Sequence, residues 1–263
     1  MRLITLKTNI NMLTCNLIGG LGNKMFQIAT TYSLSLDNND ESVFEITQFS
    51  NAHQPINSYT ENIFRFVKFG ITNCNKTYQE PFFHYSEIPY TTNLKLYGYF
   101  QSEKYFLHNR EQILDLYAID EKSKEEIYKK YGKFLKEKTC SIHIRRGDYL
   151  GLPEHHPICS IEYYNQAISN FDKETIFLVF SNDIEWCKKN FKGPQFIFIE
   201  GEKDYIDLWL MSLCKNNIIA NSSFSWWAAW LNTNPNKIVI TPKNWFGKAI
   251  NHNTQDLIPN EWC

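Results

Sequence analysis

The sequence predicts an α/β protein with parallel sheets, divided into two domains. In the second half, short apolar runs alternate with stretches of helical periodicity, and two of these runs, 177–180 and 196–199, are apolar at every position. Strands that helices bury on both faces show this continuous pattern, whereas strands with one face in water alternate. The chain has 263 residues, and a domain usually takes roughly 150, which favours two domains.

The first half is expected to open with a strand, a glycine loop and a helix. A strand-like run over 14–18 leads into the GGLG run from Gly19. Apolar residues then recur at helical spacing from Met25 to Leu36, which predicts a helix. A second strand is expected over 94–97, followed by a turn and by a helix near 113–117.

The domain boundary is expected in a charged part of the chain. No pattern in 40–89 predicts its elements. The stretch 120–138 is strongly charged and has few apolar anchors, as is typical of a segment between two cores. We therefore expect domains over 1–137 and 138–263.

Five strands and their connecting helices are predicted in the second domain. The strands are expected over 140–144, 175–180, 195–199, 217–220 and 237–240. Ser160 is placed to cap a helix that turns Ile161, Tyr164 and Ile168 inward, because a serine hydroxyl accepts from the first free amides of a helix.

Composition and charge exclude several classes of protein. Hydrophobic residues make up 43% and charged residues 21%, as in ordinary globular proteins. The 27 Lys and Arg nearly balance the 28 Asp and Glu, so no nucleic-acid surface is expected. The seven cysteines are never spaced as Cys-x-x-Cys, which predicts neither a zinc site nor a disulfide framework.

The same composition predicts a cytoplasmic protein. An odd number of scattered cysteines fits a reducing compartment, and the first 13 residues lack the apolar core of a secretory signal. No run approaches the roughly 18–20 apolar residues that cross a bilayer. No transmembrane segment is therefore expected, and peripheral association with a membrane is left open.

Polar residues follow three of the predicted strands at the point where each strand ends. The three clusters are Arg145-Arg146-Gly147-Asp148, Ser181-Asn182-Asp183 and Asn221-Ser222-Ser223. In open parallel sheets, ligands bind beyond the carboxyl ends of the strands, where loops and helix N-termini converge. We expect the three clusters to share one ligand site.

Arg145 is the strongest candidate for binding an anion in this site. Strand alternation places His143 and Arg145 on the same face. A guanidinium can hold a pyrophosphate through two parallel charge-assisted hydrogen bonds. Arg146 is expected to face away and to pair with a carboxylate, and Asp148 to orient the arginines. A salt-bridged strand end in water is the competing structural interpretation.

Two further motifs have both a structural and a functional interpretation. Ser222 and Ser223 predict a capped helix start, and such a start also binds anions. The tryptophans that follow are expected in the core. The GGLGN run from Gly19 departs from the dinucleotide G-x-G-x-x-G spacing; it predicts either a tight turn or close approach to a sugar that Asn23 would contact. No cluster of metal ligands occurs, so no metal or cofactor is expected.

Five ordered blocks resemble the bacterial-type α-1,2-fucosyltransferases of glycosyltransferase family 11. They are GGLGNKMFQIA from Gly19, GYFQSEKYF from Gly98, HIRRGDY from His143, FSNDIEWC from Phe180 and the tryptophan-rich block from Asp207. The resemblance implies a GT-B architecture of two facing Rossmann-like domains with parallel sheets. The first domain would hold the acceptor and the second GDP-fucose, and the sugar would be transferred with inversion and without a metal.

The resemblance also implies roles for single residues. Arg145 would bind the β-phosphate, Asn23 would lie near the fucose and the acceptor, and both would act in catalysis. Asp183 and His143 would contact the guanine, and Ser222, Ser223 and Phe224 the diphosphate. Gly20 and Asp148 would be further substrate-binding residues. Lys24, Asn182 and Asn216 depart from the residues usual in the family, which are Gln, Asp and His.

The function that follows is transfer of L-fucose from GDP-β-L-fucose to the 2-hydroxyl of a terminal galactose on a glycan. Two alternatives stay open: a fucosyltransferase of another linkage, α-1,6 or protein O-linked, and an inactive GDP-sugar-binding or glycan-binding protein. The general base is not identified; Asp148 and the pair His155-His156 are candidates.

Overall fold

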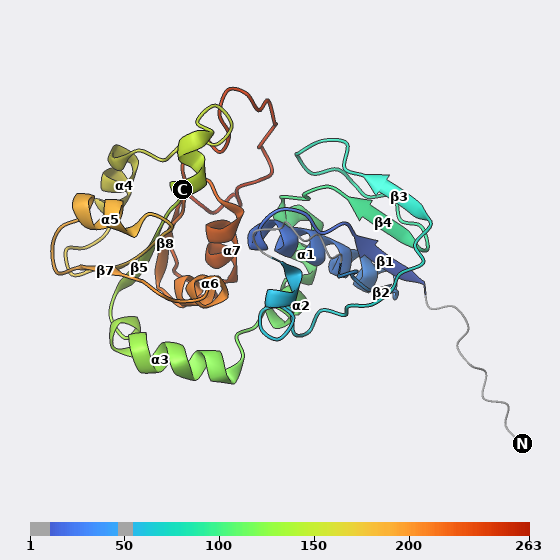
Figure 1. Ribbon diagram of the computed structural model, residues 1–263, viewed down its shortest axis with the longest axis horizontal. Coiled ribbons are helices and arrows are strands. Elements are labelled where there is room, and N and C mark those ends of the chain that lie inside the picture. Colours follow the sequence, from blue (N-terminus) through green and yellow to red (C-terminus); the bar gives the residue numbers. More distant parts are fainter. Residues whose placement is uncertain (1–10, 47–54) are drawn as a thin grey trace, which may run out of the picture. The chain divides into compact units, whose positions relative to one another are not determined.

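A computed structural model describes residues 11–46 and 55–263 (Figure 1). The chain forms two compact units, Met1–Tyr117 and Ala118–Cys263. Helix α3 (Glu121–Leu135) belongs to the second unit. The domain limits expected from the sequence, 1–137 and 138–263, would assign this charged helix to the first domain. Residues 1–10, on which the prediction of no secretory signal depends, lie outside the described part.

The first unit is built on a four-stranded parallel sheet of order β2-β1-β4-β3. Its strands are β1 (Met12–Cys15), β2 (Glu41–Ser42), β3 (Lys76–Gln79) and β4 (Leu94–Tyr97). The predicted strand over 94–97 is confirmed as β4. The first strand lies over 12–15 rather than 14–18, because the residues after Cys15 already enter the glycine loop.

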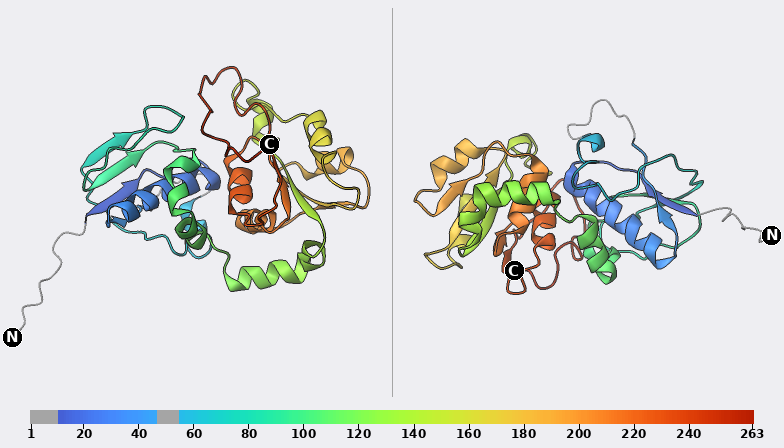
Figure 2. Two further views of the ribbon diagram at one scale, coloured as in Figure 1. Left: turned by 180° about the vertical axis from the view of Figure 1, so that it is seen from behind. Right: turned by 90° about the horizontal axis from the view of Figure 1, so that it is seen from below.

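Helix α1 (Leu21–Asp37) supplies the core of this unit. Its side chains Met25, Phe26, Ile28 and Ala29 are fully buried, and the helix lies along one face of the sheet (Figure 2). The remaining helices are α2 (Arg110–Leu116) and the 3₁₀ turns η1 (Ile56–Ser58), η2 (Glu103–Tyr105) and η3 (Leu107–Asn109). The predicted helix near 113–117 is confirmed as α2.

The second unit is built on a five-stranded parallel sheet of order β7-β6-β5-β8-β9. Its strands are β5 (Thr139–Ile144), β6 (Ile176–Ser181), β7 (Phe196–Phe198), β8 (Asn216–Ile218) and β9 (Val239–Ile240). Each overlaps one of the five predicted runs. Parallel pairing is therefore confirmed in both units.

Helices cover both faces of the second sheet, which explains its continuous apolar runs. Figure 1 shows α4 (Ile161–Ile168) and α5 (Ile184–Asn190) on one face, and α6 (Asp204–Ser212) and α7 (Ser223–Leu231) on the other. Ser160 caps α4 as predicted, since its hydroxyl accepts from the Tyr163 amide. The tryptophans of α7, Trp226, Trp227 and Trp230, are buried in the core, also as predicted.

Candidate functional site at the strand ends of the second unit

The three polar clusters lie at the carboxyl ends of three neighbouring strands, β6, β5 and β8. The loops after these strands contact one another directly. The Arg146 amide donates to Asn182 Oδ1 at 3.0 Å, which joins the loops after β5 and β6. The Tyr149 hydroxyl donates to the Asn221 carbonyl at 3.2 Å, which joins the loops after β5 and β8. The clusters therefore form one polar edge.

Arg145 stands at the end of β5 and is held from within its own loop. Its Nη2 donates to the Asp148 carboxylate at 2.9 Å, and its guanidinium carbon lies 5.5 Å from the centroid of the Tyr149 ring. The side chain is 34% exposed. A guanidinium carries five N–H donors and the contact with Asp148 is made through Nη2, so Arg145 is oriented and still has donors for a ligand.

Arg146 points to a different set of partners, in the direction of β6. Its Nε donates to Asp183 Oδ2 at 3.1 Å, and its guanidinium carbon stacks 4.2 Å from the centroid of the Trp186 ring. Asp183 Oδ1 accepts from the Trp186 amide and caps α5. The two neighbouring arginines thus separate into an accessible cation and a largely buried, paired one.

His143 is a buried and neutral imidazole next to Arg145. Burial, and then the charge of Arg145, lower the pKa of His143 to about 3. Its ring centroid lies 5.4 Å from that of Phe224, and its Nδ1 has no partner among the residues that the structure describes. A neutral imidazole can accept one hydrogen bond and donate another.

The start of α7 is arranged differently from the capped start that the sequence predicted. Ser222 is the N-cap residue, but its hydroxyl accepts no hydrogen bond from the helix, so the predicted side-chain cap is wrong. The hydroxyl of Ser225 bonds the loop before the helix, within reach of the carbonyls of Ala220 and Ser222. The positive end of α7 therefore meets this edge of the sheet without a serine cap, as anion-binding helix starts do.

Buried side chains hold the loop after β8 in place. Asn221 is 2% exposed, and its Nδ2 donates to the carbonyls of Pro157 and Trp245 at 2.9 and 3.0 Å. Gly147 packs so closely on the next loop that a Cβ there would lie 2.3 Å from Asn182 Nδ2. Ser222, Ser223 and Phe224 thus follow a buried residue, Asn221, that two hydrogen bonds fix in place.

Two aromatic residues of the site were not predicted. Tyr149 contacts Arg145, and Trp186 contacts Arg146. Their positions offered a signal: Tyr149 directly follows the RRGD run, and Trp186 lies one turn beyond the N-cap residue Asp183, so each is within reach of the arginines.

Gly20 and Asn23 belong to the first unit and form a separate group at the end of β1. Gly20 is the N-cap residue of α1 and is exposed. Asn23 Oδ1 accepts from Gln101 Nε2 at 2.9 Å. Gly19 has a φ of +78°, and a Cβ on it would lie 2.4 Å from Asn23 Nδ2. Glycine is therefore required beside Asn23. Lys24 is buried, and its ammonium donates to the Gly19 carbonyl.

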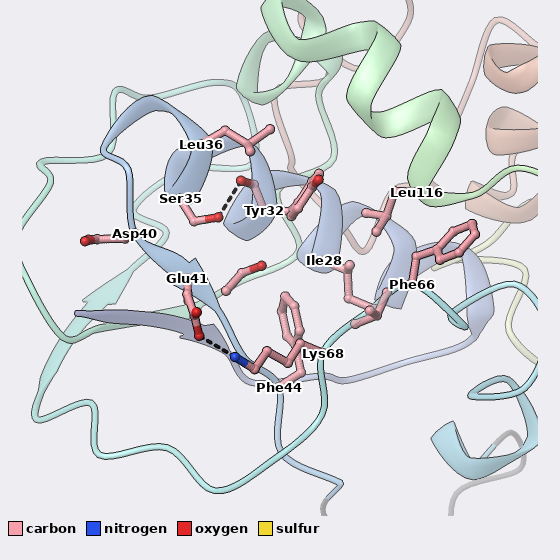
Figure 3. Close-up of a pocket in the computed structure, with 12 residues that line it drawn as sticks. Ile28, Tyr32, Ser35, Leu36, Asp40, Glu41, Phe44, Phe66, Lys68 and Leu116 are labelled. Carbon is pink, nitrogen blue, oxygen red and sulfur yellow. Dashed lines mark hydrogen bonds and ion pairs between the residues drawn. The ribbon is translucent and has the colours of Figure 1, made fainter. Parts of the chain in front are cut away.

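A cavity of about 250 Å³ lies elsewhere in the first unit, between α1, β2 and the segment 66–68 (Figure 3). Its floor is apolar, and the ion pair of Lys68 with Glu41 lies at its rim. None of the predicted site residues lines it. Within residues 11–46 and 55–263, no group of three His, Cys, Asp or Glu side chains is placed to hold a metal ion. Over the same residues, no helix is both long and apolar enough to cross a bilayer.

Comparison with known proteins gives matches over nearly the whole chain for one family profile and two bacterial relatives, and over about half of it for a human relative. The profile described as Glycosyl transferase family 11 matches residues 2–263. An alpha-1,2-colitosyltransferase of Escherichia coli is 31% identical, over 96% of this chain and 98% of its own length. The O-antigen biosynthesis glycosyltransferase WbnK of E. coli is 33% identical, over 95% of this chain and 99% of its own length. Human galactoside alpha-(1,2)-fucosyltransferase 1 is 30% identical, over 52% of this chain and 43% of its own.

Solved structures show the same fold. Fucosyltransferase NodZ from Bradyrhizobium superposes with a TM-score of 0.58 at 13% identity, covering 90% of this chain and 98% of that one. POFUT1 superposes with a TM-score of 0.53 at 10% identity, and the match covers 91% of this chain and 100% of that one. The two α/β units with parallel sheets thus have the architecture of the GT-B fucosyltransferases.

Proposed function

Because this chain belongs to glycosyl transferase family 11, we propose that it transfers L-fucose from GDP-β-L-fucose to the 2-hydroxyl of a terminal galactose. The observation that carries the proposal is the arrangement of Arg145. It is oriented by Asp148, keeps free donors, and stands on the polar edge to which the uncapped start of α7 also belongs. That combination suits a diphosphate leaving group.

The chemistry follows from the charges that develop in the reaction. The acceptor hydroxyl attacks C1 of the sugar and releases its proton, while the bond from C1 to the phosphate oxygen breaks, so the β-linked donor gives an α-linked product. Negative charge collects on the departing GDP. Donors that are already aimed at that charge lower the barrier, because they interact more strongly with the transition state than with the ground state. We assign this role to Arg145, assisted by the amides at the start of α7.

Recognition of the base is assigned to His143 and Asp183. Guanine presents both donors and acceptors at its edge. Asp183 keeps lone pairs beyond those used by Arg146 and the Trp186 amide, and the neutral His143 has an unpartnered Nδ1. In the first unit, Gly20 leaves room for the sugar, and Asn23 offers its amide to sugar hydroxyls.

The test is substitution of Arg145. Arg145→Ala should lower transfer from GDP-fucose to a β-galactoside at least about a hundredfold, the scale of losing a preorganised charge stabiliser. Arg145→Lys should recover only part of this loss, because an ammonium cannot make two parallel bonds. Transfer is measured by chromatography of the labelled product. Lys138→Ala is the matched control, since it removes a cation from the other end of β5. Near-normal turnover by Arg145→Ala would rule out the proposed role.

The donor sugar has a second candidate. The colitosyltransferase matches nearly the full chain, and colitose is fucose without its 3-hydroxyl. Competition between GDP-fucose and GDP-colitose at equal concentration decides between them, because a site that bonds the 3-hydroxyl rejects the sugar lacking it. Linkage analysis of the product separates the 2-hydroxyl from other linkages. Binding of GDP-fucose without any transfer would instead indicate a binding protein.

A further inference from the structure

Glu80 lies at the carboxyl edge of the first sheet and bonds a turn on the neighbouring strand. Its Oε2 accepts from the Tyr99 amide at 2.7 Å, and its Oε1 accepts from the Phe100 amide at 3.0 Å. Its own amide donates to the Tyr97 carbonyl at 2.9 Å. One carboxylate thus satisfies two successive amides of the turn that follows β4.

The turn has a conformation that needs such support. Phe100 has a φ of +52°, the left-handed region that residues with a Cβ rarely adopt, and its side chain is fully buried. Gly98 makes room for the carboxylate, since a Cβ there would lie 2.5 Å from Glu80 Cβ and 2.6 Å from Oε2. The backbone of the turn and the Glu80 side chain are therefore fitted to each other.

The opposite side of the turn is bonded to the glycine loop and the start of α1. Gln101 Nε2 donates to Asn23 Oδ1 at 2.9 Å. Gln27 bridges the two segments, since its Nε2 donates to the Gly98 carbonyl and its Oε1 accepts from the Ile18 amide, both at 3.0 Å. A continuous chain of hydrogen bonds thus runs from Glu80 through the turn to Asn23.

We propose that Glu80 is a positioning residue: its carboxylate fixes the turn Gly98–Gln101, and through Gln101 it sets the orientation of the Asn23 side chain. The consequence for transfer rests on the proposed function, in which Asn23 contacts the sugars. The consequence for the turn does not.

The pair of hydrogen bonds from the Tyr99 and Phe100 amides to the Glu80 carboxylate, which we call the clamp, should respond to pH near neutrality. Burial raises the pKa of Glu80 to about 7, although its two amide bonds oppose this. The titratable groups that face it are Tyr78 on β3, Tyr105 on η2 and Cys15 on β1, and burial raises the pKa of each. All three are neutral at pH 7, so Glu80 is the group that changes charge. The ionised carboxylate accepts both amides well, whereas the protonated one is a weaker acceptor.

The experiment compares Glu80→Gln with Glu45→Gln in the full chain. Glu45 is a matched control because its carboxylate also accepts from two groups of one segment, the amide and the hydroxyl of Thr72. The first readout is the amide resonances of Tyr99 and Phe100 in ¹⁵N-labelled protein between pH 5 and 9. In the wild type and in Glu45→Gln, both resonances should titrate with a midpoint near 7, and in Glu80→Gln this titration should vanish.

The second readout is kinetic. Misplacing Asn23 should lower kcat about tenfold or more in Glu80→Gln, with the KM for GDP-fucose changed less than about twofold. The loss of activity that we expect for the wild type below a pH of about 7 should also disappear. Gln101→Ala removes the hydrogen bond to Asn23 and leaves the clamp intact. Its kcat should therefore fall while the Tyr99 and Phe100 resonances still titrate.

The two readouts separate the two proposals. If the amides titrate as described but no variant or wild-type protein transfers sugar, the clamp stands and the proposed function fails. If the wild type transfers sugar and the Tyr99 and Phe100 resonances are unchanged in Glu80→Gln, or if kcat in Glu80→Gln equals that of Glu45→Gln, the positioning role is overturned.

Discussion

Two neighbouring arginines at the end of β5 meet different environments, and each therefore affects a different property. Arg146 and Asp183 form a pair whose side chains are 16% and 30% exposed, and the Arg146 guanidinium also stacks on Trp186. Arg145 is more accessible and contacts Asp148 and Tyr149. Arg146 should contribute mainly to stability, whereas Arg145 should contribute mainly to turnover.

Arg146→Ala should lower the free energy of unfolding by about 1–3 kcal/mol, because it leaves the Asp183 carboxylate without its charged partner. Partial exposure keeps the effect below that of a fully buried pair. Urea denaturation measures it. Lys138→Ala removes an exposed ion pair with Asp172 and should leave the free energy of unfolding unchanged. Equal effects of the two substitutions would contradict this account of Arg146.

Glu80 should give the stability of the protein a distinct dependence on pH. Its pKa of about 7 lies above the ordinary value of 4.5, so between these values the folded chain binds more protons than the unfolded one. The contribution of this carboxyl to stability is then full below about pH 4.5 and is lost as pH rises to about 7. Relative to the wild type, Glu80→Gln should gain stability by up to about 3 kcal/mol over that range.

Glu45→Gln should show the opposite trend. The Thr72 hydroxyl holds the pKa of Glu45 below its ordinary value, so the wild-type carboxylate adds stability above that value and loses it as pH falls. Thermal unfolding of the three proteins from about pH 2.5 to about pH 8 measures both effects. Parallel curves for the two variants would contradict both pKa assignments.

The sequence predicted which residues stand at the strand ends, that Asp148 orients the arginines and that Arg146 pairs with a carboxylate, but not that this carboxylate is Asp183. Strand alternation located His143 and Arg145, and the end of each apolar run located Asp183 and Ser222. Arg145 pairs with Asp148 and Arg146 pairs with Asp183, and this choice of partners depends on how the loops after β5 and β6 bend. That bend comes from contacts between distant segments, such as the Arg146 amide with Asn182.

At the scale of single elements, burial explains which strands could be predicted. β5 and β6 lie side by side inside a sheet covered on both faces, so β5 is buried at every position and β6 carries the continuous apolar run 177–180. β3 has the sequence KTYQ, is mostly exposed and lies at an edge, and β2 has only two residues. Neither carries an apolar signal; each is a strand because of the neighbour with which it pairs.

The turn η4 (Gly147–Gly151) should be sensitive to an added methyl group at its first residue. In Gly147→Ala, the new Cβ would meet Asn182 Nδ2 and displace the side chain that accepts from the Arg146 amide. We expect about a tenfold weaker Kd for GDP, on the scale of one hydrogen bond to a positioning group. Isothermal titration calorimetry measures it. Gly151→Ala is the control, because a Cβ there meets nothing within 4 Å; an equal loss in both variants would contradict the argument.

At the scale of the whole molecule, donor binding should appear as a change in stability. A ligand that binds only the folded state stabilises it by mass action, by about 2.7 kcal/mol at a hundredfold excess over Kd. GDP-fucose and GDP should therefore raise the Tm of the wild type, and much less that of Arg145→Ala. UDP-galactose is the control nucleotide sugar. An equal shift with UDP-galactose would contradict recognition of guanine by His143 and Asp183.

Two parallel-sheet units could be predicted for the whole molecule because a parallel sheet shows itself in local apolar runs. The point of division depends on packing instead. Helix α3 is charged and has only a few buried anchors, such as Ile127 and Leu135, yet it contacts α6 and groups with the second unit. Charge alone marks the region of the boundary and not the side to which its helix belongs.

The indole cluster of α7 gives the protein a built-in optical label for half of its chain. All seven tryptophans, from Trp186 to Trp262, lie in the second unit, and none occurs between residues 1 and 117. Emission excited at the indole band therefore follows the melting of the second unit only, while far-ultraviolet circular dichroism follows both. Any separation between the two melting curves then measures directly how strongly the folding of one unit is coupled to that of the other.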